Sequence, residues 1–260
     1  MKLIISLNHK ERLYDYVSMD IDCFILGGQY SFYAPSYFSL DDISQMVKQY
    51  PQCSFYVAVN ALYDEHEIEA VEAYIDALSK MAIHGILFQD FGVLQIVKNK
   101  GYHFDMMYAP ETLNTNAMTL NVLKQQGVTS AQLARVIPLE EQLSIHQQVH
   151  MPLMLQVHGV EYIAASKRAL LTNYQEASGL AFDHKSQKRL TIQPRNSDYV
   201  FHIYENERGT HIFSKTRLYM LDLLNQIQSF EYLYIETLMM SDEEAIEVAS
   251  LYSDALKSFE

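Results

Sequence analysis

Short, continuously apolar runs alternate with amphipathic stretches along almost the whole chain. The runs lack the apolar–polar alternation of a strand with one wet face, so they are typical of strands covered on both faces, as in a parallel sheet. Eight strands are predicted, at Lys2–Leu7, Cys23–Gly27, Ser54–Val59, Gly85–Phe88, Phe104–Tyr108, Ala131–Ala134, Pro152–Val157 and Tyr232–Ile235.

Helical periodicity fills several of the intervals between these strands. In Glu65–Met81 the apolar residues recur at helical spacing, and Asp64 stands at the N-cap position. Ser241 has Glu244 three residues later, which is the spacing of a capping box. Further helices are predicted at Asn116–Gln126, Pro138–Gln147 and Asp242–Leu256.

Repeated strand–helix units predict a parallel sheet with helical crossovers. About eight strands are enough to close a ring, so we expect an α/β fold of the TIM-like (β/α) barrel type. No Gly-x-Gly-x-x-Gly follows any strand, which removes the main support for an open dinucleotide-binding sheet. We see no linker or low-complexity segment, and therefore expect a single domain over residues 1–260.

One segment departs from the regular alternation, between the seventh and eighth predicted strands. It holds two strand-like runs, Arg189–Gln193 and Tyr199–Tyr204, then a turn at Glu207–Gly209 and a third run at His211–Phe213. Such runs joined by a turn containing glycine are typical of antiparallel hairpins. We predict an antiparallel β insertion at about residues 180–214, before the last strand of the barrel.

Composition narrows the class of protein further. At 49% hydrophobic residues, a chain of 260 has ample material for a core, and no apolar run is long enough to cross a bilayer. The two cysteines, Cys23 and Cys53, lie in apolar runs and cannot build a disulfide framework or a cysteine-ligated cluster. We expect a cytoplasmic protein with free buried thiols, no metal and no other cofactor.

The net charge of -13 argues against nucleic-acid binding by the whole surface, because contacts to phosphate need Lys and Arg. The charge is uneven, however. The segment from Lys167 to Arg217 contains nine basic and five acidic residues, so its net charge is near +4 and that of the remainder is near -17. Such asymmetry marks either an interaction surface or an ordinary solvated hairpin.

Polar residues at strand ends supply the candidate chemistry, because the functional groups of a barrel gather at its C-terminal face. His158 and Glu236 are candidate catalytic acid–base residues. The guanidinium of Arg135 suits a carboxylate or phosphate ligand. Each has a structural alternative: Arg135 would pair internally with Glu236 or Asp90, and His158 would be a satisfied core histidine. The remaining ligand-binding candidates are Asn60, Asp90 and Glu111.

Motifs of hydrolytic enzymes are missing. The chain has no Gly-x-Ser-x-Gly, and His66-Glu67 is followed by no second histidine four residues on. Neither cysteine has sequence neighbours of the kind that would activate it as a nucleophile. The residues themselves therefore give no support to peptidase activity.

The stretch 153–174 carries the most specific pattern in the chain. It reads as a buried strand that delivers His158-Gly159 at its end and then runs into a short helix. It resembles the signature of the collagenase-like peptidases, peptidase family U32, which is roughly Glu-x-Phe-x-His-Gly-x-x-Cys-x-x-x-Ser-Gly-x-Cys-x-x-Ser-Asn-Tyr. Tyr162 and Ala169 occupy the two cysteine positions, and Gln156 the acidic one. The matching residues are His158, Gly159, Ser166, Asn173 and Tyr174.

Weaker pieces of the same resemblance occur in order along most of the chain. They include counterparts of the family's Val-Asn-Thr-Leu, Asp-x-Gly-Val-Leu, Leu-Ala-Arg and Glu-Asp-Glu-Arg-Gly-Thr motifs, and of the glutamate near its last strand. These counterparts are Val59–Leu62, Asp90–Leu94, Leu133–Arg135, Glu205–Thr210 and Glu236.

The departures from the family pattern are equally informative. Several branches of the family hold an iron–sulfur cluster with four cysteines, whereas the corresponding positions here are Tyr162, Ala169, the region 179–181 and Tyr219. The resemblance therefore implies no cluster in this chain. The short length and the lost motifs resemble the smaller member of a pair found in some bacteria, which is linked to 5-hydroxyuridine formation at the tRNA wobble position.

This resemblance implies a non-catalytic or weakly catalytic subunit that forms a hetero-oligomer with a longer paralogue and reaches tRNA through that partner. Two alternatives stay open at this point. One is an independent barrel that binds a small anionic ligand with Arg135, His158 and Glu236; the other is the peptidase activity of the family name. The residues expected to contact RNA or the partner are Lys167, Arg168, Lys188, Arg189 and Arg208.

Overall fold

The computed structural model describes residues 1–184 and 190–259. Eight parallel strands close into a ring, in which β11 pairs with both β1 and β7. The TIM-like barrel expected from the sequence is confirmed, and four of its strands have the predicted bounds. The ring consists of β1 (Lys2–Ser6), β2 (Cys23–Gly27), β3 (Ser54–Val59), β4 (Gly85–Phe88), β5 (Asp105–Tyr108), β6 (Ser130–Gln132), β7 (Leu153–Ser166) and β11 (Tyr232–Ile235).

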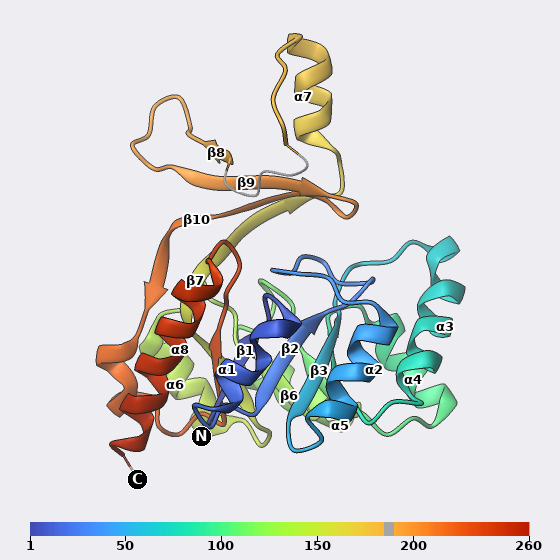
Figure 1. Cartoon of the computed structure of the whole chain (residues 1–260), viewed down its shortest axis with the longest axis vertical. Helices are drawn as coiled ribbons and strands as arrows, with labels where there is room; N and C mark the ends of the chain where they lie inside the picture. The colour runs from blue at the N-terminus through green and yellow to red at the C-terminus, as the bar shows by residue number, and fades with distance from the viewer. Residues whose placement is uncertain (185–189, 260) are drawn as a thin grey trace.

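Helices lie between the strands and around the ring (Figure 1). The predicted N-cap Ser241 accepts a hydrogen bond from the Glu244 N–H, and Asp64 forms a capping box with Glu67. Asn116, predicted as a helical residue, is instead the N-cap of α5 and accepts from the Thr119 N–H. Two helices that the sequence did not predict, α2 and α4, are capped by Ser39 and Asp90. The helices are α1 (Leu13–Val17), α2 (Leu40–Gln49), α3 (Ile68–Leu78), α4 (Phe91–Lys100), α5 (Ala117–Gln125), α6 (Leu139–Gln148), α7 (Leu170–Ser178) and α8 (Asp242–Lys257), with short 3-10 turns η1 (Lys10–Arg12), η2 (Glu65–Glu67) and η3 (Leu221–Gln226).

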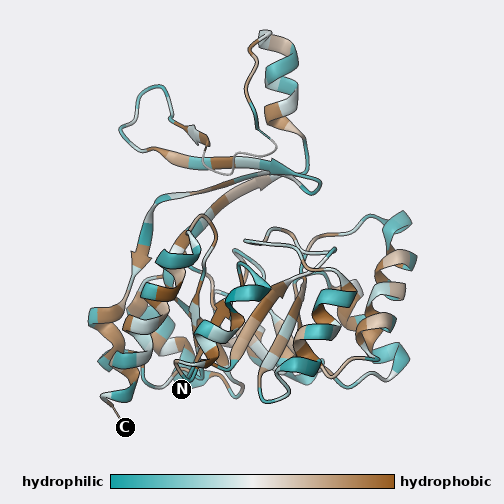
Figure 2. Cartoon of the chain, in the orientation of Figure 1, coloured by the Kyte–Doolittle hydropathy of each residue, from teal (hydrophilic) through white to brown (hydrophobic). Residues whose placement is uncertain are grey.

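The ring strands are apolar throughout because both of their faces are covered. One face packs inside the barrel, in a small cluster that includes Ile25, Tyr56 and Met154. The other packs against the helices in a larger cluster that includes Phe24, Phe55 and many other side chains. Figure 2 shows the apolar colouring along the ring strands and the polar colouring on outward helix faces. Burial of each large apolar side chain contributes about 1.5–3 kcal/mol to the free energy of unfolding.

Beyond the ring, the same sheet continues from β7 as an antiparallel extension built by residues 159–184 and 190–219, which we call the arm (Figure 1). β7 does not end at Val157 but continues to Ser166 and pairs with β10. The arm therefore begins earlier than the predicted insertion at 180–214, and α7 starts at Leu170 rather than directly after Gly159. The other arm strands are β8 (Leu190–Ile192), β9 (Phe201–Asn206) and β10 (Gly209–Tyr219).

Gly159 is the point at which β7 passes from the ring to the arm. Its φ is +113°, and its backbone lies directly against that of Glu236, so a Cβ here would lie 2.8 Å from the Glu236 Cβ and closer still to its carbonyl oxygen. The Glu236 N–H donates to the carbonyl oxygen of His158 at 2.9 Å. Only glycine satisfies both the backbone angle and the close approach.

None of the helices within the described residues is long and apolar enough to span a membrane.

We predict that Gly159→Ala lowers the free energy of unfolding by about 3 kcal/mol or more, because it combines backbone strain with a clash against Glu236. Gly127→Ala is the matched control: its φ is +100°, but a Cβ there meets nothing within 4 Å. This control should lower the free energy of unfolding only by the backbone strain, about 1–2 kcal/mol. Urea denaturation measures both, and equal losses would contradict the role given to the close approach.

Candidate functional site

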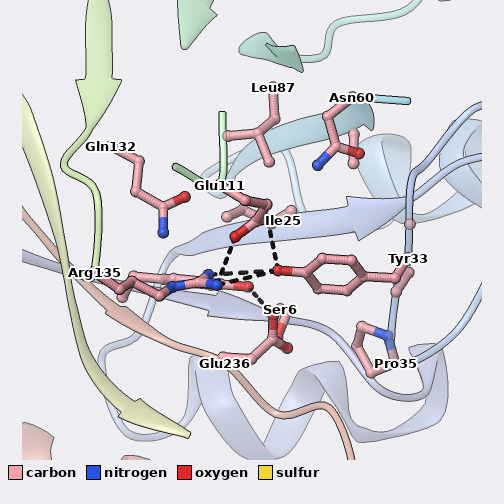
Figure 3. Close-up of a pocket in the computed structure, with 14 residues that line it drawn as sticks. Ser6, Ile25, Tyr33, Pro35, Asn60, Leu87, Glu111, Gln132, Arg135 and Glu236 are labelled. Atoms are coloured by element: carbon pink, nitrogen blue, oxygen red, sulfur yellow. Dashed lines mark hydrogen bonds and ion pairs between the residues drawn. The ribbon is translucent and has the colours of Figure 1, made fainter. Parts of the chain in front are cut away.

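The carboxyl ends of the ring strands surround a small cavity of about 30 Å³, which we call the mouth cavity (Figure 3). Three of the four predicted ligand-binding residues, Asn60, Glu111 and Arg135, line it, as does the predicted catalytic Glu236. The other polar residues of the lining are Ser6, Tyr33, Gln132 and Tyr234.

Arg135 is held by an internal ion pair. Its Nη1 donates to Glu111 Oε2 at 2.6 Å, and the Tyr33 hydroxyl donates to Glu111 Oε1 at 2.7 Å. The side chains of Arg135 and Glu111 are only 6% and 8% exposed. Burial raises the pKa of Glu111, and the charge of Arg135 opposes this rise. The internal partner of Arg135 is thus Glu111, and neither Glu236 nor Asp90.

Glu236 is buried on the opposite wall of the cavity, and the surrounding groups satisfy its carboxylate. Oε1 accepts from the Ser6 hydroxyl at 2.9 Å and from the Leu238 N–H at 2.9 Å. Oε2 accepts from the Tyr234 hydroxyl at 2.7 Å. A buried carboxylate with three donors is stabilised in place, so this arrangement serves the fold without any ligand.

His158 does not line the mouth cavity. Its ring lies outside the barrel, with centroids 6.0 Å from Tyr219 and 5.8 Å from Tyr252. Burial lowers the pKa of His158 to about 4, so the imidazole is neutral at neutral pH. Only the backbone of His158 contacts Glu236, while its ring packs against Tyr219 and Tyr252. The catalytic roles of His158 and Glu236 stay predictions.

Asn60 and Asp90 have different surroundings. Asn60 Oδ1 accepts from the Phe32 N–H at 3.0 Å, and its amide nitrogen points toward the cavity (Figure 3). Asp90 caps α4, accepting from Gly92 N–H at 2.8 Å, and also accepts from Tyr63 N–H at 3.1 Å. Asp90 therefore has a capping role away from the cavity.

Aromatic rings of the arm pack against Tyr33, which lines the mouth cavity. Tyr33, from the loop after β2, stacks on Tyr162 with ring centroids 6.3 Å apart and an interplanar angle of 8°. Phe213 meets Tyr33 edge-on at 4.9 Å and stacks on Tyr204 at 5.9 Å. Because Tyr33 also donates to Glu111, this group of rings, the aromatic seal, connects the arm to the buried ion pair.

The turn between β9 and β10 fastens the arm to the barrel. Arg208 pairs with Glu67 at 2.5 Å and lies over the rings of Tyr30 and Tyr63, each at 5.5 Å. Asn206 Nδ2 donates to the Phe32 carbonyl oxygen at 3.1 Å. Arg208, a predicted RNA or partner contact, is therefore engaged within the chain.

The other predicted RNA or partner contacts differ in their surroundings. Lys167 is exposed and pairs with Asp64 at 2.7 Å. Arg168 is exposed at the base of α7. Lys188 and Arg189 lie outside the described residues.

The residues at the family's cysteine positions do not fit an iron–sulfur cluster. Tyr162 belongs to the aromatic seal, and Tyr219 lies opposite His158 on the neighbouring strand. Neither these side chains nor that of Ala169 offers the thiolate that iron needs. Within residues 1–184 and 190–259, no three His, Cys, Asp or Glu side chains are grouped so that they could hold a metal ion.

Sequence reasoning missed the groups that hold the charged residues in place. Ser6 ends β1 and Tyr234 lies two residues before Glu236, so the strand-end argument that found Glu236 could have found both. Tyr33 and Leu238 lie in loops without periodicity, and no sequence pattern marks their contacts.

Eight parallel strands with outer helices and a polar cavity at their carboxyl ends define this protein as a TIM-like (β/α) barrel. The family model of peptidase family U32 matches residues 8–260. The chain therefore belongs to peptidase family U32, as its resemblance to the family implies.

Relatives of this family support the assignment. tRNA hydroxylation protein P2 of Bacillus subtilis (strain 168) is 27% identical over 244 residues, which cover 90% of this chain and 78% of that protein. tRNA hydroxylation protein P1 of the same organism is 23% identical over 68% of this chain, but only 43% of its own length is matched. Among solved structures, the U32 peptidase Mk0906 aligns with a TM-score of 0.56 at 14% identity, covering 90% of this chain and 92% of that one; this likeness concerns the fold alone.

We predict that Arg135→Ala lowers the free energy of unfolding by about 3–5 kcal/mol, because it leaves the Glu111 carboxylate buried and unpaired. The double variant Arg135→Met/Glu111→Leu should recover most of this loss, since no unpaired charge remains. Denaturant titration of the two variants against wild type tests this. A single variant as stable as wild type would contradict the buried ion pair.

We also predict that stability falls as the pH is lowered from about 6.5 toward 4. Burial lowers the pKa of both His158 and His211 to about 4, from 6.5. Between these values the unfolded chain binds protons that the folded chain does not, so unfolding becomes more favourable at lower pH. In thermal unfolding between pH 7 and 5, His158→Gln should show a shallower decline than wild type. An unchanged slope would contradict the neutral buried imidazole.

Proposed function

We propose that this chain is the non-catalytic or weakly catalytic subunit of a two-protein system that hydroxylates the wobble uridine of tRNA. Its partner would be a longer, cysteine-containing member of family U32, and both would work in the cytoplasm. The observation that carries the proposal is the small, internally paired barrel mouth, in which Arg135 and Glu111 neutralise each other and Glu236 accepts three hydrogen bonds from neighbouring groups.

The size of the mouth cavity supports this reading. At about 30 Å³ it has room for roughly one or two water molecules. An enzyme that modifies a base must take that base into a pocket of its own shape. A nucleobase would have to displace Tyr33 and break its hydrogen bond to Glu111 before it could reach Arg135 or Glu236.

The two Bacillus subtilis relatives support the pairing. This chain matches most of tRNA hydroxylation protein P2, whereas it spans less than half of tRNA hydroxylation protein P1. A short and a long protein that both carry tRNA hydroxylation in their names fit the pair implied by the lost motifs. Because this chain has only two cysteines, a four-cysteine cluster would have to reside in the longer protein.

The two alternative functions find less support. An independent binder of small anions would need a free guanidinium, but Arg135 is already paired with Glu111. A peptidase would need a nucleophile beside a base, and the His158 ring lies outside the mouth cavity against Tyr219 and Tyr252.

We predict that cells lacking this gene lose 5-hydroxyuridine-derived nucleosides from their tRNA, and that the wild-type gene restores them. Nucleoside mass spectrometry of total tRNA is the measurement, with an unrelated modified nucleoside as the internal control. An unchanged profile in the deletion strain would exclude the tRNA hydroxylation role.

A further inference from the structure

Helix α5 is apolar on two faces. Ala117, Leu120 and Leu123 are buried against the barrel. On the outer face Met118 is 82% exposed and Val122 is 56% exposed, and their spacing of four residues makes them neighbours on the helix surface. A surface helix normally carries polar residues outside, so an apolar outer face is typical of a helix that is covered by another molecule.

Two loops that are hydrogen-bonded to each other carry further exposed apolar side chains. Leu113, before α5, is 65% exposed, and Val136, after β6, is 69% exposed. Asn114 joins the two loops: its side chain donates to the Gln132 carbonyl oxygen at 2.8 Å, and its carbonyl oxygen accepts from the Ala134 N–H at 3.1 Å. We call Leu113, Met118, Val122 and Val136 the α5 patch.

Acidic residues are absent from α5, as they are from α4, whose charged residues are Lys98 and Lys100. The chain carries 32 acidic residues, and α2, α3 and α8 all bear several of them. Helix α5 bears none, and its single charged residue, Lys124, donates to the carbonyl oxygen of His150. Depletion of charge together with exposed methionine and aliphatic side chains is characteristic of the core of a protein interface.

We propose that the α5 patch is the docking surface for the longer U32 protein; this inference rests on the proposed function. Glu140 and Glu141 are exposed in the first turn of α6, four and five residues after Val136. The partner surface should therefore be apolar with Lys or Arg at its rim. A second copy carries the same net charge of -13 and the same two glutamates, so electrostatics disfavours it as the occupant.

Docking at this place would couple the partner to the barrel mouth. Leu113 lies two residues after Glu111, and Val136 directly follows Arg135, so the loops under the patch are those that hold the buried ion pair. The partner would order these loops through apolar contacts without entering the mouth cavity.

The test is a titration of purified wild-type chain with the longer protein, followed by light scattering of the complex. Met118→Glu/Val122→Glu should weaken binding about tenfold or more, because it places two carboxylates in the apolar centre of the interface. Tyr174→Glu/Tyr199→Glu is the matched control: both tyrosines are exposed, on the arm, and this variant should bind as wild type does. Thermal unfolding confirms that both variants are folded.

Glu140→Lys/Glu141→Lys provides a second readout, with weaker binding expected at low salt and a difference that shrinks as salt is added. Loss of binding in the arm variant, with none in the α5 variant, would overturn the proposal in favour of the arm. A wild-type homodimer that only the α5 variant disrupts would assign the patch to a second copy instead. Absence of any wild-type complex would contradict the two-protein function itself, whereas normal binding by the α5 variant would contradict only the docking site.

Discussion

The passage of β7 past the backbone of Glu236 is the constraint on which the rest of the structure depends. At Gly159 one strand leaves the parallel ring and enters the antiparallel arm, and only a residue without a side chain allows the two backbones to approach so closely. This crossing fixes where the arm stands relative to the barrel mouth. It thereby places Tyr162 over Tyr33 and, through Tyr33, closes the site above the Arg135–Glu111 pair.

The internal pairing at the mouth also explains how the barrel can bury charged residues without a bound ligand. Two carboxylates and one guanidinium are buried there, and each unpaired charge would cost several kcal/mol. Arg135 neutralises Glu111, while hydroxyl and backbone donors hold Glu236. Removing one member would leave a buried charge without a partner. The retained polar residues at the strand ends therefore have a structural reason to persist, independent of catalysis.

Much of this could be predicted from the sequence, because both faces of each ring strand are buried and give a continuous apolar run. Strand ends then located Asn60, Glu111, Arg135 and Glu236 at one cavity. The same reasoning placed His158 wrongly, because β7 has a register shift beside it. Gln156 lies opposite Tyr234, which lines the cavity. His158 lies opposite Ile235, which belongs to the outer core. A bulge reverses the face of every later side chain, and no sequence pattern marks it. The arm was placed too late because Ala164 and Ala165 favour a helix locally, while pairing with β10 makes them part of a strand.

If this chain is the non-catalytic subunit that we propose, the mouth of its barrel does no chemistry of its own. The most direct test is the hydroxylation rate of tRNA by the reconstituted pair, with this chain either wild type or carrying Glu236→Gln. The substitution keeps the shape of the side chain but removes the carboxylate. We expect equal rates at equal complex concentration. A large loss of rate in a complex that still assembles would show that Glu236 takes part in the reaction, and would rule out a non-catalytic barrel mouth.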